Sequence, residues 1–161
     1  MKELFLLRHA KSSWESLLED RNRSLTKKGI ERVKSVAVAS SEVFKDIEIV
    51  YSSPANRAVH TACIAMKQLH IPFELLNIRE ALYTFEISQL LNFIKSLSDN
   101  YSKVICIGHN PAFTQAVNQL STTKLDHLPT AAWARIQFEQ SNWKNVHNGK
   151  INLGLPKEIL K

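Results

Sequence analysis

Two histidines and two arginines stand in this chain where their side chains could do chemistry. Arg8 and His9 directly follow one short apolar run, His109 follows another, and Arg57 lies just after a third. A guanidinium group keeps its charge and matches a pair of phosphate oxygens. A neutral imidazole nitrogen is a nucleophile, and a second imidazole is able to stabilise developing oxygen charge. The four residues therefore predict a site for a tetrahedral anion such as a phosphoryl group.

The segments between these residues predict the scaffold that positions them. Apolar runs typical of strands occupy residues 3–7, 47–51, 73–78, 103–107, 134–138 and 150–155. Helical spacing covers 26–40 (with Thr26 as the cap), 53–69 (opened by Ser53-Pro54), 87–97 and 111–120. This alternation predicts an α/β fold: a three-layer sandwich with a mainly parallel sheet and helices on both faces. Ligands bind such sheets beyond the carboxyl ends of the strands, where the four residues lie.

Length and composition are those of one soluble globular domain spanning residues 1–161. Apolar residues make up 44% and charged residues 22%, which excludes a disordered or fibrous chain. No apolar run is long enough for a membrane helix, and the N-terminal run is too short for a signal peptide. Cys63 and Cys106 lie inside apolar segments and do not form a disulfide framework. We therefore expect a cytoplasmic protein without membrane contact.

The basic excess raises the alternative of a nucleic-acid partner. The chain carries 21 Lys+Arg against 15 Asp+Glu, a formal charge of +6. The lysines are scattered, only Lys27 and Lys28 are adjacent, and no nucleic-acid motif is present. We therefore predict no nucleic-acid partner, and a mildly basic surface that steers acidic substrates toward the anion site.

Glu80 follows the third predicted strand and is a candidate proton donor to the leaving group, if apolar neighbours raise its pKa. The alternative is an ordinary exposed glutamate. A metal site built from His9, His109 and Glu80 is a rival use of the same residues, but the arginines would repel a cation and no H-E-x-x-H spacing exists. The sequence predicts neither a metal nor an organic cofactor.

Three motifs together resemble the histidine phosphatase (phosphoglycerate mutase-like) superfamily. They are Arg8-His9 after an apolar strand, the pattern Ser-Pro-x-x-Arg-Ala-x-x-Thr-Ala at residues 53–62, and Gly-His-Asn-Pro at residues 108–111. The segment Asp-Arg-Asn-Arg-Ser-Leu-Thr-Lys-Lys-Gly at residues 20–29 and the short length resemble its phosphohistidine phosphatase branch, the SixA-like proteins. The resemblance implies a phosphoglycerate mutase-like fold.

The resemblance also implies a role for each matching residue. His9 would be the phosphorylated nucleophile, and Arg8, Arg57 and His109 would hold the phosphoryl group. Arg23 would lie beside the pocket, and Glu80 matches the general acid position of the wider superfamily. No metal or cofactor is implied.

Three positions depart from the common pattern of that family. Ala10 replaces the glycine after the histidine, Glu15 stands where an asparagine contacts phosphate, and Ser24 replaces a proline. The chain is also too short for the insertions that cover the site in phosphoglycerate mutases, which predicts an open pocket with Trp14 as a rim candidate.

The expected function is removal of a phosphoryl group through a phosphohistidine intermediate at His9, with phosphohistidine in a protein as the substrate. In the first step His9 takes the phosphoryl group while Glu80 protonates the leaving group; in the second, water attacks phospho-His9. The alternatives are a small-molecule phosphomonoesterase of the same superfamily and a phosphoprotein-binding module that holds phosphate without turnover.

Overall fold

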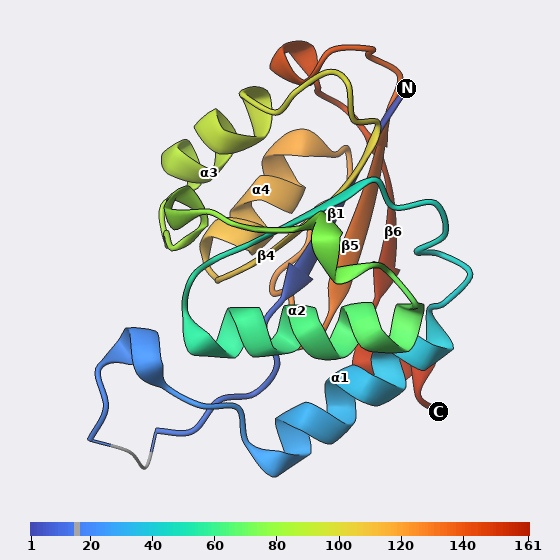
Figure 1. Cartoon of the computed structure of the whole chain (residues 1–161). Helices are drawn as coiled ribbons and strands as arrows, with labels where there is room; N and C mark the ends of the chain where they lie inside the picture. Colours follow the sequence, from blue (N-terminus) through green and yellow to red (C-terminus); the bar gives the residue numbers. More distant parts are fainter. Residues whose placement is uncertain (15–16) are drawn as a thin grey trace.

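The protein is built around a six-stranded sheet, described by a computed structural model that covers residues 1–14 and 17–161. In spatial order the strands are β3 (Leu76–Ile78), β2 (Ile49–Ser52), β4 (Lys103–Gly108), β1 (Lys2–Arg8), β5 (Trp133–Phe138) and β6 (Lys150–Gly154). The first four are parallel, whereas β5 runs antiparallel to both β1 and β6 (Figure 1). The predicted mainly parallel sheet is confirmed.

Helices cover both faces of this sheet, which confirms the three-layer α/β prediction. Helices α1 (Lys27–Ala39) and α2 (Asn56–Leu69) lie on one face, and α3 (Ile87–Lys95) and α4 (Ala112–Leu120) on the other (Figure 1). A short helix, α5 (Pro156–Ile159), ends the chain beside α1. Four 3-10 turns complete the connections: η1 (Asp20–Asn22), η2 (Phe73–Leu75), η3 (Glu80–Leu82) and η4 (Trp143–Asn145).

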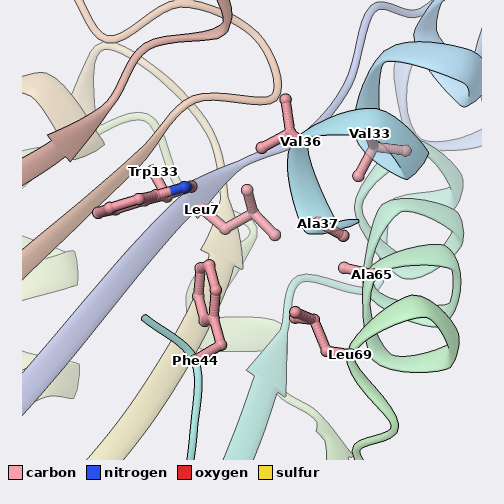
Figure 2. A pocket seen from close by; sticks show the side chains of 8 residues that line it. All are labelled: Leu7, Val33, Val36, Ala37, Phe44, Ala65, Leu69 and Trp133. Carbon is pink, nitrogen blue, oxygen red and sulfur yellow. The ribbon is translucent and has the colours of Figure 1, made fainter. Parts of the chain in front are cut away.

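The middle residues of the central strands β1 and β4 are apolar because they are buried on both faces of the sheet. In β1, Leu4 and Leu6 pack toward α3 and α4, whereas Phe5 and Leu7 pack toward α1 and α2. Figure 2 shows the second of these cores, where Leu7 meets Trp133 and the facing side chains of both helices. The indole Nε1 of Trp133 donates to Ser40 Oγ at 2.8 Å, so the one polar group of that ring is satisfied.

Hydroxyl side chains shape the starts of the first two helices. The Thr26 cap is confirmed, because Thr26 Oγ1 accepts a hydrogen bond from Gly29 N at 3.0 Å. Helix α2 begins later than expected, at Asn56, because Ser53 Oγ accepts a hydrogen bond from the amide of Ala55 in the turn that precedes the helix.

Among the described residues, every helix is too short or too polar to traverse a lipid bilayer.

The strand predicted at residues 73–78 is wrong in its first half. Residues 73–75 form η2 after Pro72, and only 76–78 pair with β2 as the short edge strand of the sheet. Proline cannot donate to a ladder, and edge strands are commonly short. The strand therefore begins at Leu76 rather than at residue 73 but ends at Ile78 as predicted, and η3 follows after Arg79.

Candidate active site

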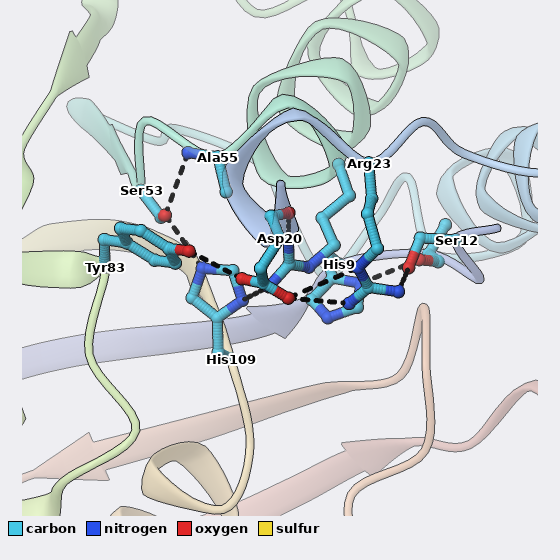
Figure 3. A network of polar contacts seen from close by, with 10 residues as sticks. His9, Ser12, Asp20, Arg23, Ser53, Ala55, Tyr83 and His109 are labelled. Atoms are coloured by element: carbon cyan, nitrogen blue, oxygen red, sulfur yellow. Dashed lines mark hydrogen bonds and ion pairs between the residues drawn. The ribbon is translucent and has the colours of Figure 1, made fainter. Parts of the chain in front are cut away.

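The two histidines meet because the strands before them end side by side. Arg8 of β1 is in register with Gly108 of β4, and the amide of His9 donates to the Gly108 carbonyl at 3.2 Å. The rings of His9 and His109 therefore lie 5.3 Å apart between centroids, at the carboxyl edge of the sheet (Figure 3). The structure brings together these two predicted site residues.

The His9 ring is held in one orientation and one tautomer. Its Nδ1 lies 2.7 Å from the carbonyl oxygen of Ala10, and a carbonyl only accepts, so Nδ1 carries the proton and Nε2 keeps its lone pair. Burial lowers the pKa of His9 to about 4. The hydrogen bond to Ala10 raises this pKa, whereas the positive charges of Arg57, Arg8 and Arg23 lower it further. At neutral pH the ring is thus uncharged, with a nucleophilic nitrogen available.

The backbone around His9 is fixed from two directions. On one side the amide of Ala131, which has a left-handed φ of 61°, approaches the carbonyls of both Arg8 and His9 at 3.2 Å. On the other side the amide of Ala10 donates to Thr61 Oγ1 at 3.0 Å, and that hydroxyl donates to the Arg57 carbonyl at 2.6 Å. Thr61 therefore ties the loop after β1 to the turn of α2 that carries the arginine.

Arg57 is almost fully buried in the first turn of α2 and reaches across the site. Its Nη1 donates to the Asp20 carbonyl at 2.7 Å, and its Nη2 lies 3.0 Å from Asp20 Oδ2 and 3.3 Å from His109 Nδ1. Arg8 extends in another direction, where Nη1 donates to the Leu128 carbonyl at 3.0 Å. Both arginines line the same hollow as His9.

Asp20 is a member of this site that the sequence analysis did not single out. Its carboxylate accepts from Arg57, from Tyr83 Oη at 2.6 Å and from Arg23 Nε at 3.3 Å (Figure 3). Partial burial opposes its ionisation, but the hydrogen bonds from Tyr83 and Arg57, with the charges of Arg57 and Arg23, outweigh this and lower the pKa of Asp20 to about 2. An ionised carboxylate therefore offsets the charge of the arginines in the site.

Arg23 lies beside the pocket, where the resemblance placed it. It is buried, and its Nη1 donates to Ser12 Oγ at 2.9 Å. The exposed indole of Trp14 covers its guanidinium, with 3.5 Å between Cζ and the ring centroid. Glu15, the expected substitute for a phosphate-contacting asparagine, lies outside the described residues.

His109 is a neutral ring whose two nitrogens both have protein partners. Because Arg57 only donates, Nδ1 accepts from it, and Nε2 carries the proton toward Ser53 Oγ at 2.8 Å. Burial, followed by the fields of His9 and Arg57, lowers the pKa of His109 to about 3, with Asp20 acting in the opposite direction. The rings of Tyr83 and Phe85 lie 5.5 Å and 5.4 Å from it and form a wall of the site.

Glu80 is not brought into the pocket with the others. It opens η3, is exposed, and forms an ion pair with Arg21, whose guanidinium lies 5.0 Å from the Tyr83 ring. The hydrogen bond from Arg21 lowers the pKa of Glu80, whereas a proton donor was expected to have a raised one. The ion pair with Arg21 holds this carboxylate outside the hollow that contains His9.

The resulting pocket is an open hollow of about 400 Å³. Its lining consists of Arg8, His9, Lys11, Ser12, Trp14, Asp20, Arg23, Arg57, Phe85 and Thr130. In the part of the chain that the structure describes, no group of three or more histidine, cysteine, aspartate or glutamate side chains is arranged to hold a metal ion. The arrangement is suited to bind an anion against three arginines and to attack it from His9 Nε2.

Comparison with known proteins agrees with this fold. The family model of the histidine phosphatase superfamily (branch 1) matches residues 4–83, which include His9, Arg23, Arg57 and Glu80. The matched segment is 80 of the 161 residues, and this similarity to the superfamily supports a phosphatase, a hydrolase of phosphorylated substrates. An uncharacterized chloroplastic protein of Arabidopsis thaliana is 29% identical over 155 residues, which cover 90% of this chain and 70% of that protein.

Solved structures are similar to this fold over most of the chain. The protein histidine phosphatase SixA, solved with tungstate, matches with a TM-score of 0.83 and 23% identity over 99% of each chain. A putative phosphohistidine phosphatase SixA from Agrobacterium tumefaciens matches with a TM-score of 0.70 and 19% identity, over 85% of this chain and 92% of that one. A putative alpha-ribazole-5'-P phosphatase from Escherichia coli matches at 0.73 and 15%, over 96% and 97%. The phosphoglycerate mutase-like fold is thus the one predicted.

Proposed function

We propose that the protein removes phosphoryl groups from phosphohistidine in proteins, through a covalent intermediate on His9. The observation that carries the proposal is the fixed tautomer of His9, whose Nδ1 donates to Ala10 while Nε2, in the hollow with the arginines, has no hydrogen-bond partner among the described residues. In the first step the Nε2 lone pair forms a bond to phosphorus. The bond from phosphorus to the leaving imidazole nitrogen breaks, and that nitrogen keeps the electron pair and takes a proton from solvent.

In the second step a water molecule attacks the phosphorus of phospho-His9. The new P–O bond forms, the N–P bond to His9 breaks, and the water proton is lost to solvent as phosphate leaves. Nδ1 of His9 stays protonated in both steps, so the carbonyl of Ala10 stabilises the charge that the ring carries while it is phosphorylated. Arg57, Arg8 and Arg23 supply positive charge for the phosphoryl oxygens.

The open pocket supports a phosphoryl group carried on a protein. Trp14 and Phe85 at its rim are exposed, so the bulk of a protein substrate has room outside the hollow. A phosphorylated imidazole is also a leaving group that takes up a proton readily. It makes little demand on a general acid, in keeping with Glu80 lying outside the pocket.

The test measures phosphate release from a histidine-phosphorylated protein and from a small aryl phosphate, by wild type and by His9→Ala. Exposed His60 on α2 supplies the control His60→Ala. We expect His9→Ala to lose activity by at least about a thousandfold and to yield no acid-labile phosphoenzyme, while His60→Ala keeps both. Full activity in His9→Ala would refute the covalent mechanism, and loss of wild-type activity with a chelator would favour the metal alternative.

The second candidate is a small-molecule phosphomonoesterase, which the similarity in fold to the alpha-ribazole-5'-P phosphatase favours. It predicts a higher kcat/KM for a phosphate monoester than for phosphohistidine protein, and a need for Glu80 as the acid. A phosphoprotein-binding module is the third reading, and it predicts retained phosphate without release from either substrate.

We further propose that the protein acts in the cytoplasm. Cys63 and Cys106 are both free, and Cys106 is buried in the core between β4 and the helices. A reducing compartment keeps such thiols unpaired. Fractionation of cells that express the full-length gene, with detection of the endogenous chain, tests this location.

A further inference from the structure

A second hollow adjoins the active site and is lined almost entirely by cationic side chains. It has a volume of about 260 Å³, and its lining is Lys11, Lys28, Gly29, Arg32 and Thr130. Lys11 and Thr130 also line the hollow that contains His9. The two hollows therefore meet, and a chain that leaves the active site on this side passes three positive charges.

The backbone brings these cations together by a close contact between α1 and the loop after β1. The amide of Thr26 donates to the Lys11 carbonyl at 2.9 Å, which fixes the start of α1 against that loop. Gly29 allows the contact, because a Cβ at this position would lie 2.3 Å from the Lys11 carbonyl oxygen. Lys28 and Arg32 then follow one helical turn apart and face the same hollow as Lys11.

The three cations lack an ion-pair partner among residues 1–14 and 17–161. None of Lys11, Lys28 and Arg32 forms an ion pair with any residue that the structure describes. Like charges four residues apart on a helix repel each other, so Lys28 and Arg32 are an unfavourable pair in the free protein. An anionic ligand would relieve this repulsion.

The cationic lining continues beyond this hollow along α1. Arg32 also faces a hollow that contains Lys157 and Glu158, and Lys28 and Arg32 face one that contains Lys27 and Glu31. Glu31 and Glu158 thus line these two further hollows. The hollow lined by Lys11, Lys28 and Arg32 contains positive charges and no acidic side chain.

We propose that Lys11, Lys28 and Arg32 form a basic groove that binds an acidic segment of the phosphorylated protein substrate. The proposal rests on the proposed function, since the groove opens from the phosphatase pocket. A polypeptide fits better than a nucleic acid, because three charges beside a pocket suit a few carboxylates and not a long phosphate backbone. The groove would select proteins whose phosphohistidine lies near aspartate and glutamate.

The test uses two synthetic peptides phosphorylated on one histidine: one with four aspartates or glutamates near it, and one with the matching asparagines and glutamines. The enzymes are wild type, Lys28→Glu/Arg32→Glu, and a charge-matched control, Lys144→Glu/Lys150→Glu, with both control lysines exposed and outside all the hollows described above. Free phosphohistidine serves as a substrate too small to reach the groove.

For wild type and the control we expect kcat/KM to be about tenfold higher for the acidic peptide than for the neutral one, and the ratio to shrink as salt is raised. In Lys28→Glu/Arg32→Glu the ratio should fall to about one or below, with unchanged turnover of free phosphohistidine. Equal hydrolysis of both peptides by wild type would overturn the groove and leave the proposed function intact. If wild type hydrolyses no phosphohistidine substrate, the proposed function is refuted instead. If wild type binds RNA tightly and in a salt-sensitive way, and the double variant does not, the groove is assigned to nucleic acid and the peptide proposal is overturned.

Discussion

The Asp20 carboxylate and the Arg57 guanidinium form an ion pair inside the anion site, with 3.0 Å between Oδ2 and Nη2. The same Arg57 nitrogen lies 3.3 Å from His109. An internal carboxylate therefore occupies hydrogen-bonding positions on Arg57 and Arg23 that a phosphoryl group would also seek. A bound substrate has to compete with Asp20 for these donors or bind beside it.

This competition predicts the effect of Asp20→Asn. The amide keeps the shape of the side chain but removes its negative charge, so Arg57 and Arg23 should bind an added anion more strongly. We expect inorganic phosphate and vanadate to inhibit Asp20→Asn with inhibition constants about tenfold lower than for wild type. Exposed Asp126 supplies the control, Asp126→Asn, which should leave both constants unchanged. Weaker inhibition would show that Asp20 chiefly positions Arg57.

The lowered pKa of His9 predicts that stability depends on pH. The unfolded chain takes up a proton at this residue near pH 6.5, but the folded chain does so only near pH 4. Between these values the unfolded state binds more protons, so the contribution is fully present above about pH 6.5 and is lost as pH falls toward 4. A separation of about 2.5 pH units corresponds to a loss on the order of 3 kcal/mol.

Urea unfolding of phosphate-free protein at several pH values measures this loss. In His9→Gln the free energy of unfolding should fall less steeply over the same window, by roughly half, because His109 with a folded pKa of about 3 still contributes. Identical pH dependence in wild type and His9→Gln would contradict the prediction.

Glu80→Gln separates the two candidate substrate classes. If the leaving group is an imidazole, kcat for a phosphohistidine substrate should change less than about threefold, because Glu80 is exposed and paired with Arg21. If the enzyme works on phosphate monoesters with Glu80 as the acid, kcat for an aryl phosphate should fall at least about a hundredfold. The matched control is Glu74→Gln, an exposed carboxylate in η2.

Gly29→Ala tests the contact between α1 and the loop after β1. A Cβ would meet the Lys11 carbonyl oxygen at 2.3 Å, and backbone atoms cannot move aside as a side chain can. We expect the free energy of unfolding to fall by about 1–3 kcal/mol, with a higher KM because the loop carries residues of the pocket. Exposed Ala39 in the last turn of α1 provides a comparison, because Ala39→Gly should cost no more than about 1 kcal/mol and leave KM unchanged.

The placement of His9, Arg8, Arg57 and His109 was predictable from the sequence for a physical reason. Apolar runs mark buried strands, and parallel strands end at a common edge, so residues just after them converge. Asp20 and Tyr83 were not predictable in this way, because Asp20 opens one 3-10 turn and Tyr83 directly follows another, and such turns carry no periodic pattern. The outward position of Glu80 was not predictable either, because Glu80 also lies in a 3-10 turn and pairs there with Arg21.

The central position of β1 has a consequence for how the site comes into being. His9 follows β1, but the two strands that flank β1 begin only at Lys103 and Trp133. Further contacts to the backbone around His9 come from Ala131 and Ala132, just before β5. Contacts so distant in sequence form slowly and cannot form before their second partner exists. A growing chain that has not yet reached β4 and β5 therefore lacks the contacts that fix His9, and the site forms only after β5 has been synthesised.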